Sequence, residues 1–310
     1  MIDMRPILIA GPTASGKSGL ALRLAEHLGG VVINADSMQV YRELRILTAR
    51  PGPAEEVRVP HALYGFVAGA DSYSAGRYAA DVARVLTDAC REGRRPIIVG
   101  GTGLYFKALG EGLSPIPPIP DEVRAHWRAE AADKGAAHVH GVLTARDAEM
   151  AQRLAPGDTQ RIARALEVLD ATGISLADWQ RMPRAPVLDL AGTIPLVVSV
   201  EREELSRRID LRFLTMMERG ALDEVLQLKA LDLDPSLPLM TALGVRPLLA
   251  YLAGELSRDA AIAAGQTETR QYAKRQVTWA GSNMIAWTRI ETKEMEMSGA
   301  DFVSFIQARH

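Results

Sequence analysis

The stretch Gly11-Pro12-Thr13-Ala14-Ser15-Gly16-Lys17-Ser18 matches the phosphate-binding pattern G-x-x-x-x-G-K-[ST] at every fixed position. It follows the apolar run Pro6 to Ala10 and precedes leucines and alanines at helical spacing up to Leu28. Glycines let the backbone curl so that N–H groups face phosphate oxygens, and the helix start adds its positive dipole end. Lys17 supplies a mobile positive charge, and the Ser18 hydroxyl suits Mg²⁺. The stretch therefore predicts a phosphate site at a strand-to-helix turn.

The pattern of strand, polar turn and helix recurs further along the chain. Val31 to Ile33, Pro96 to Val99 and Ile194 to Val200 are short apolar runs that predict three more buried strands. A strand, a helix and a strand within about thirty residues form a unit whose strands are parallel. We therefore expect an α/β fold, a parallel sheet flanked by helices as in P-loop NTPases.

A proline-rich segment, Ser114 to Pro120, divides this pattern, since it suits neither a helix nor a central strand. Arginine-rich helical periodicity follows from Asp121 to about Gln180, without strand patterning. We predict a catalytic core with C-terminal helices over residues 1–114 and 192–310, and a small all-helical insertion domain over residues 115–191.

Composition excludes several classes of protein. The 310 residues are 47% hydrophobic and 24% charged, and no apolar run approaches the roughly 18 residues of a membrane span. Because the first apolar core is also too short for a secretory signal, we expect a cytoplasmic protein and no membrane partner. The net charge of −2 argues against a globally basic nucleic-acid binder but permits a local basic face. Cys90, the only cysteine, excludes internal disulfides and cysteine zinc sites, and we expect it to be buried.

Two further strand ends carry polar residues that are candidates for the site. Asp36 follows the second strand and suits a general base, a metal ligand or simply a helix N-cap. Thr102 lies in the glycine-rich turn after the third strand, where it could bond a ligand or cap a helix. Ligands of open α/β sheets bind beyond the carboxyl ends of the strands, so the three turns should meet at one site. On the phosphate loop alone, a small-molecule kinase is the first hypothesis.

A resemblance to a known family decides between these interpretations. The strings GPTASGKS, NADSMQVYREL, VGGTGLYFKAL with GLSPIP, DTQRIARALEV and AKRQVTW occur in that order between Ile7 and about Trp287. They resemble the tRNA dimethylallyltransferase family, also called tRNA isopentenyltransferase, whereas a kinase would share only the first. The resemblance is to the bacterial form, since the sequence ends without a cysteine/histidine zinc finger. A non-catalytic RNA-binding protein with a relic loop is disfavoured because Lys17, Ser18 and Asp36 are all present.

The resemblance implies an activity and partners. A monomer would transfer the dimethylallyl group of dimethylallyl pyrophosphate to N6 of the adenosine just 3′ of the anticodon, in tRNAs that read codons beginning with U. Mg²⁺ would assist, with Ser18 as its protein ligand, and no nucleoside triphosphate would be consumed. The tRNA partner is the anticodon stem-loop.

The resemblance also assigns residues. Gly11 to Ser18 would bind the pyrophosphate, with Thr13, Lys17 and Ser18 in direct contact. Asp36 would be the general base, while Thr102 and Arg124 would act around the reacting groups and the pyrophosphate. The residues expected to contact tRNA are Asp36, Ser37, Met38, Gln39, Gln160, Arg161, Ile162, Ala163, Arg164, Arg246, Lys274 and Arg275.

A few positions depart from the family's pattern. Leu47 replaces a usual glycine, and we expect it to lie away from the chemistry. Thr241 and Val245 replace a common basic residue and a tyrosine, and Gly281 stands where an arginine is common. These last three put the C-terminal tRNA contacts in doubt.

Overall fold

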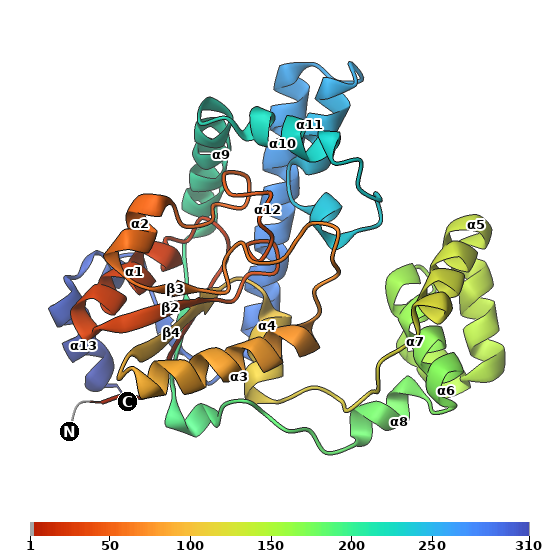
Figure 1. Cartoon of the computed structure of the whole chain (residues 1–310), viewed down its shortest axis with the longest axis horizontal. Helices are drawn as coiled ribbons and strands as arrows, with labels where there is room; N and C mark the ends of the chain where they lie inside the picture. Colours follow the sequence, from red (N-terminus) through yellow and green to blue (C-terminus); the bar gives the residue numbers. More distant parts are fainter. Residues whose placement is uncertain (1–2, 310) are drawn as a thin grey trace. The chain divides into compact units, whose positions relative to one another are not determined.

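A parallel sheet forms the centre of the larger part of the protein. In the computed structural model, which describes residues 3–309, this sheet has six strands in the order β3-β2-β4-β1-β5-β6. Figure 1 labels three of them, β3, β2 and β4. The strands are β1 Ile7–Ala10, β2 Gly30–Asn34, β3 His61–Ala62, β4 Arg95–Gly100, β5 Ile194–Val198 and β6 Thr288–Ile290. The predicted parallel α/β fold is confirmed. The two strands that the sequence did not predict, β3 and β6, lie at the edges and are too short to form a recognisable apolar run.

Helices cover both faces of the sheet. Side chains alternate along a strand, so Ile7 and Ile9 of β1 pack on one face, while Leu8 and Ala10 pack on the other. The first face is covered by α1 and α13, and the second by α3 and α4 (Figure 1). These helices are α1 Lys17–Leu28, α3 Ala75–Arg91, α4 Gly103–Gly110 and α13 Gly299–Gln307.

A group of C-terminal helices extends the apolar cluster on the face of the sheet that α3 and α4 cover. Buried residues of these helices, such as Phe213 and Val225, pack with Val40, Leu44 and Leu47 of the loop after β2. The helices are α9 Arg202–Glu218, α10 Ala221–Ala230, α11 Val245–Leu252 and α12 Arg258–Asn283, with the short α2 Pro53–Arg58 in the β2–β3 connection. Three short turns of 3₁₀ helix, Leu190–Gly192, Pro238–Thr241 and Glu294–Glu296, complete the regular structure. The cluster therefore fixes the loop after β2 against α9 to α11.

The insertion is a separate helical unit, Glu111–Ala185, with an apolar core of its own around Trp127, Ile162 and Leu166. Its helices are α5 Asp121–Arg146, α6 Ala148–Arg153, α7 Thr159–Thr172 and α8 Leu176–Arg181. Gly135, with φ 78°, interrupts α5. This unit begins four residues and ends six residues before the predicted boundaries. The end differs because Val187 and Leu188 donate backbone hydrogen bonds to the Leu109 carbonyl oxygen, which ties them to the sheet-bearing unit.

The expectation that Cys90 is buried is wrong. Its neighbour Ala89 packs into the core, and the next position on a helix points about 100° away, so Cys90 is exposed. Among residues 3–309, no helix combines the length and apolar character that a membrane span requires.

Candidate active site

The phosphate loop lies between β1 and α1, as the sequence predicts. Its backbone is left-handed at Ala14, φ 62°, and at Gly16, φ 88°. This curl leaves the start of α1 without a side-chain cap, because Gly16 occupies the N-cap position. The first N–H groups of an uncapped helix are free to bind an anion. The Ser15 hydroxyl is fully buried and has no hydrogen-bond partner among the described residues.

Lys17 is half-buried, and its ammonium donates to the Pro12 carbonyl oxygen at 3.1 Å. Burial lowers the pKa of Lys17 to about 8, while the nearby Asp36 carboxylate raises it and the Arg212 guanidinium lowers it further. The lysine therefore carries a charge that the apo site stabilises poorly. A bound polyanion would relieve that deficit.

Asp36 lies at the carboxyl end of β2, in a turn that its neighbours hold tightly. Asn34, which is fully buried, accepts the N–H of Asp36 at 2.8 Å and donates to its carbonyl oxygen at 2.9 Å. The Asp36 Oδ1 accepts the N–H of Met38 at 2.9 Å within a turn, so Asp36 holds a turn and does not cap a helix, the alternative that the sequence left open. That bond orients the carboxylate, and Asp36 lines the cavity between the strand ends and α12.

Thr102 holds the same turn from the neighbouring strand β4. Its Oγ1 accepts the N–H of Ser37 at 2.9 Å, and its own N–H donates to the Ala35 carbonyl oxygen at 3.1 Å. β2 and β4 are adjacent and parallel, so their carboxyl ends meet. Thr102 thus holds both neighbours of Asp36 and thereby positions it.

Arg212, on α9, is a site residue that sequence reasoning missed. Its guanidinium donates a hydrogen bond to the Thr13 hydroxyl of the phosphate loop. Burial lowers its pKa, and the Asp36 carboxylate opposes that shift. Nothing local marks Arg212 among the several arginines of α9, so only the packing of this helix against the loop reveals it.

The long helix α12 supplies a polar face that was also missed. Gln276 is buried and bridges two strand ends: its Oε1 accepts the Thr13 N–H at 2.8 Å, and its Nε2 donates to the Gly101 carbonyl oxygen at 2.9 Å. Tyr272, one turn earlier, lines the cavity, and burial followed by the Asp36 charge raises its pKa. Polar residues three and four apart on one helix were the available signal, but such a face usually points to solvent.

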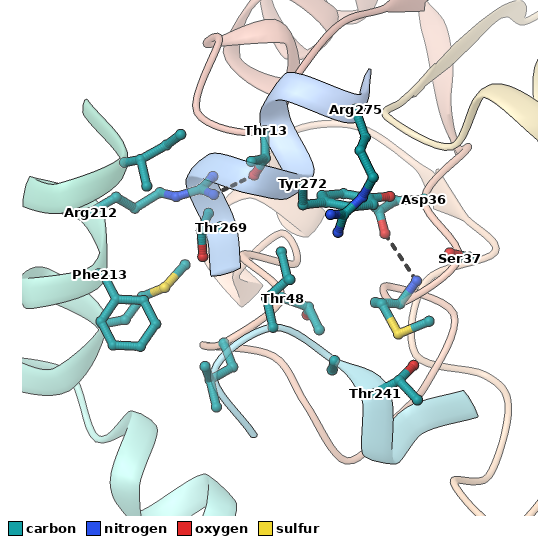
Figure 2. A pocket seen from close by; sticks show the side chains of 16 residues that line it. Thr13, Asp36, Ser37, Thr48, Arg212, Phe213, Thr241, Thr269, Tyr272 and Arg275 are labelled. Atoms are coloured by element: carbon teal, nitrogen blue, oxygen red, sulfur yellow. Dashed lines mark hydrogen bonds between the residues drawn. The ribbon is translucent and has the colours of Figure 1, made fainter. Parts of the chain in front are cut away.

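Four of these residues, Thr13, Asp36, Arg212 and Tyr272, line one cavity of about 250 Å³ (Figure 2). Thr13 and Arg212 lie on one side of it and Asp36 and Tyr272 on another, and the Arg275 guanidinium lies over the Tyr272 ring, 5.6 Å from its centroid. The lining residues are Thr13, Asp36, Ser37, Met38, Leu47, Thr48, Ile209, Arg212, Phe213, Met216, Thr241, Ala242, Leu243, Thr269, Tyr272 and Arg275. The cavity thus joins a cationic, polar part to an apolar part.

The loop after β2 carries two residues whose places were predicted, and one of those predictions is wrong. Leu47 was expected to lie away from the chemistry, but it is buried in the cavity wall, because the loop folds back against α9 and α11. Gln39 was expected to contact the adenosine. Its amide donates to the carbonyl oxygens of Thr48, at 2.8 Å, and Ala49, at 3.1 Å, and so supports that wall, while its contact with the adenosine stays a prediction. Ser37 and Met38 do line the cavity.

The remaining basic candidates of the larger unit lie on its surface. Lys274 and Arg275 border an open hollow on α12 with Trp279 and Asn283. Arg246 borders a smaller hollow of about 190 Å³, which shares Thr241 and Arg275 with the main cavity. Thr241, one of the departures from the family pattern, is therefore a cavity residue.

The candidates in the helical unit divide into two groups. Ile162 and Ala163 are buried in the core of that unit, so the expectation that they contact tRNA is wrong: they lie on the inward face of α7. The other three candidates on α7 are Gln160, Arg161 and Arg164, of which Gln160 and Arg161 are exposed.

Both arginine candidates on α7 form ion pairs. Arg161 pairs with Asp158 at 3.0 Å, and Arg164 pairs with Glu167 at 3.2 Å. The Arg161 pair is exposed and therefore weak, so a phosphate could replace Asp158 at little cost, whereas the Glu167 partner of Arg164 is buried. Arg124, on α5, lies 3.7 Å from Asp121, and its contact with pyrophosphate stays a prediction.

Comparisons with known proteins agree on one family. The model of the IPP transferase family matches residues 39–283, and that of the isopentenyl transferase family matches residues 4–64. A tRNA dimethylallyltransferase of Parvibaculum lavamentivorans is 53% identical over 303 residues, covering 97% of this chain and 96% of the relative. One of Azorhizobium caulinodans is 57% identical over 283 residues, covering 91% of each.

Solved structures give the same result. The tRNA isopentenylpyrophosphate transferase of Bacillus halodurans superposes with a TM-score of 0.68 at 28% identity, over 99% of this chain and 98% of that one. A eukaryotic dimethylallyltransferase acting on tRNA superposes with a TM-score of 0.81 at 27% identity, over 98% of this chain and 80% of that one.

Proposed function

The chain belongs to the IPP transferase family, whose curated relatives are tRNA dimethylallyltransferases, and we propose that its cavity performs that transfer. The dimethylallyl group of dimethylallyl pyrophosphate moves to N6 of the adenosine 3′ of the anticodon, in tRNAs that read codons beginning with U, and pyrophosphate leaves. One observation carries the proposal: a phosphate loop, a carboxylate and an apolar wall border the same small cavity. A kinase would need a phosphate acceptor there, and none of the relatives named above is a kinase.

The donor's pyrophosphate binds at the phosphate loop. The N–H groups at the start of α1, the Lys17 ammonium and the Arg212 guanidinium converge there. As the C–O bond to the allylic carbon breaks, negative charge gathers on the leaving pyrophosphate. Donors that are already in place stabilise this charge without reorganisation, and in many enzymes such stabilisation contributes most of the rate enhancement.

Asp36 accepts the proton from the adenine amino group. The N6 lone pair is delocalised into the ring, so attack is favoured when a base removes a proton as the new C–N bond forms. A positioned general base contributes about 10²- to 10⁴-fold. The Met38 N–H, the Asn34 amide and Thr102 hold the turn that aims the carboxylate.

The adenine enters from the anticodon loop after it leaves its stack, which costs a few kcal/mol and least where the base is unpaired. Met38, Tyr272 and Arg275 line the cavity beside Asp36, and flat or polarisable side chains of this kind stack on extruded bases. Lys274, Arg246 and the arginines of α7 are proposed contacts to the RNA backbone.

The residues present fit a Mg²⁺ ion carried by the pyrophosphate. Ser18 lies in the first turn of α1 with its side chain exposed, while residues 3–309 contain no cluster of three or more His, Cys, Asp or Glu that could hold a metal alone. Mg²⁺ commonly takes few protein ligands and several phosphate or water oxygens. Ser18 would hold the ion, which would neutralise part of the pyrophosphate charge.

We further propose that the enzyme acts as a monomer in the cytoplasm.

Incubation of purified protein with labelled dimethylallyl pyrophosphate, Mg²⁺ and unmodified tRNA tests the function directly. Label should appear in tRNA, and nucleoside analysis should place it on N6 of the adenosine 3′ of the anticodon. Unlabelled tRNA together with ATP turnover on a small acceptor would overturn the proposal in favour of a kinase.

A further inference from the structure

Leu47 forms part of the apolar wall of the cavity and packs on the backbone behind it. Its side chain is 8% exposed and lines the cavity with Phe213 and Met216. A Cβ placed on Gly244 would lie 2.8 Å from Leu47 Cδ2 and 3.0 Å from Phe213 Cε2. These distances are shorter than an ordinary van der Waals contact of about 3.5–4.0 Å. Leu47 and Phe213 therefore pack directly on the Gly244 backbone, where no larger residue would fit, and this backbone supports Leu47 from that side.

Glu224, on α10, fixes the backbone that carries Leu47. One carboxylate accepts three successive N–H groups, from Arg45 at 2.5 Å, Ile46 at 2.9 Å and Leu47 at 2.9 Å. Hydrogen bonds to a charged acceptor are about twice as strong as neutral ones. The turn at residues 45–47 is thus held from outside the cavity, and its wall resists being pushed back.

The chemistry of the two parts sets the orientation of the donor. Thr13 and Arg212 are suited to the pyrophosphate, so the allylic chain extends toward the apolar wall of Leu47, Phe213 and Met216. We propose that Leu47, held in position by Glu224, sets the upper size of the allylic chain that this enzyme accepts. The inference rests on the proposed prenyl transfer and adds a selectivity residue and a positioning residue to it.

The test compares two donors, dimethylallyl pyrophosphate and the longer geranyl pyrophosphate, with the same tRNA. Leu47→Ala removes Cγ and both Cδ atoms from the wall, and the ratio of kcat/KM for geranyl to that for dimethylallyl should rise about tenfold or more, because one methylene is worth about 10- to 200-fold in a selective pocket. Leu44→Ala is the matched control, since Leu44 is fully buried in the same loop and the same cluster but does not line the cavity. It should lower stability and leave the donor ratio unchanged.

Glu224→Gln tests the positioning role. The amide keeps one acceptor but turns a donor toward the three N–H groups, so the turn should loosen. We expect the ratio to shift in the same direction as in Leu47→Ala but by less, with a raised KM for dimethylallyl pyrophosphate. Asp223→Asn, a neighbouring position on α10, is the control and should change neither quantity.

The outcomes separate this inference from the proposed function. If wild-type protein labels tRNA and folded Leu47→Ala keeps the wild-type donor ratio, the selectivity role is wrong and the transfer activity stands. Leu47→Val provides the same comparison with a smaller expected shift if the alanine variant does not fold. If wild-type protein labels tRNA with neither donor, the proposed function itself fails.

Discussion

Arg212 of α9 donates a hydrogen bond to the hydroxyl of Thr13 in the phosphate loop, although 199 residues separate them. The contact gives the loop a second cation beside Lys17. The pyrophosphate that leaves the allylic carbon is multiply charged, so its departure is easier where both cations face it.

Replacement of Arg212 by alanine should lower kcat/KM for dimethylallyl pyrophosphate about 100-fold, since it removes one preorganised charge from the leaving-group site. Steady-state labelling of tRNA at varied donor concentration measures this. Arg207→Ala on the same helix is the control, because Arg207 is exposed and pairs with Glu204 at 2.8 Å. A change smaller than about twofold in Arg212→Ala would remove the residue from the mechanism.

Asp36→Asn should slow the chemical step about 10³-fold while donor affinity changes little, because the amide cannot accept the adenine proton. Its oxygen can still accept the Met38 N–H, so the turn should keep its shape. Single-turnover rates at saturating donor and tRNA separate chemistry from binding. Wild-type rates in a variant that binds both substrates normally would show that Asp36 is not the base.

Donor affinity should fall at alkaline pH. The pKa of Lys17 is lowered to about 8 in the free protein, so the side chain is charged below that pH and neutral above it. Of the two forms of Lys17, the ammonium is the one that attracts pyrophosphate. The Kd should therefore rise by up to about tenfold per pH unit above pH 8, and binding at about pH 8.5 should take up a proton. Calorimetry in two buffers of different ionisation enthalpy measures both quantities.

Lys17→Arg is the reference for that experiment, because a guanidinium keeps its charge throughout the range. Its Kd should vary much less with pH. A wild-type Kd that stays constant between about pH 7 and pH 9.5 would contradict the assignment.

Gln276→Ala should both destabilise the protein and weaken donor binding. It leaves the Thr13 N–H and the Gly101 carbonyl oxygen without their partner in a buried site, at a cost of about 1–3 kcal/mol in the free energy of unfolding. Denaturant unfolding and donor KM are the two measurements. Gln227→Ala, exposed on α10, should be neutral in both, and equal behaviour of the two variants would rule out a bridging role for Gln276.

Lys274→Ala should flatten the dependence of log affinity for tRNA on log salt by about one unit, because one phosphate contact and its counterion release are lost. Filter binding over a range of salt concentrations measures the slope. Lys293→Ala is the control, since that lysine is highly exposed and pairs with Glu291. An unchanged slope in Lys274→Ala would place the residue outside the RNA interface.

Several features of the site were accessible from residue patterns. The phosphate loop, Asp36 and the turn at Thr102 each follow a buried strand, and β1, β2 and β4 prove to be neighbours, so their turns meet as predicted. The helical insertion was recognised because prolines separate it from the sheet. Errors arose where a helix face had to be assigned: Cys90 proved exposed, and Ile162 and Ala163 proved buried.

The sequence by itself determined the parts of the site that are local, because a phosphate loop and a strand end need only consecutive residues. Only the tertiary structure decided which other residues line the cavity. Arg212 of α9 and Gln276 of α12 reach the phosphate loop, and Tyr272 of α12 lines the same cavity. Leu47 lies in the cavity wall because Glu224 holds its turn. Such contacts depend on how helices pack across long separations in the chain, and no spacing between neighbouring residues encodes that packing.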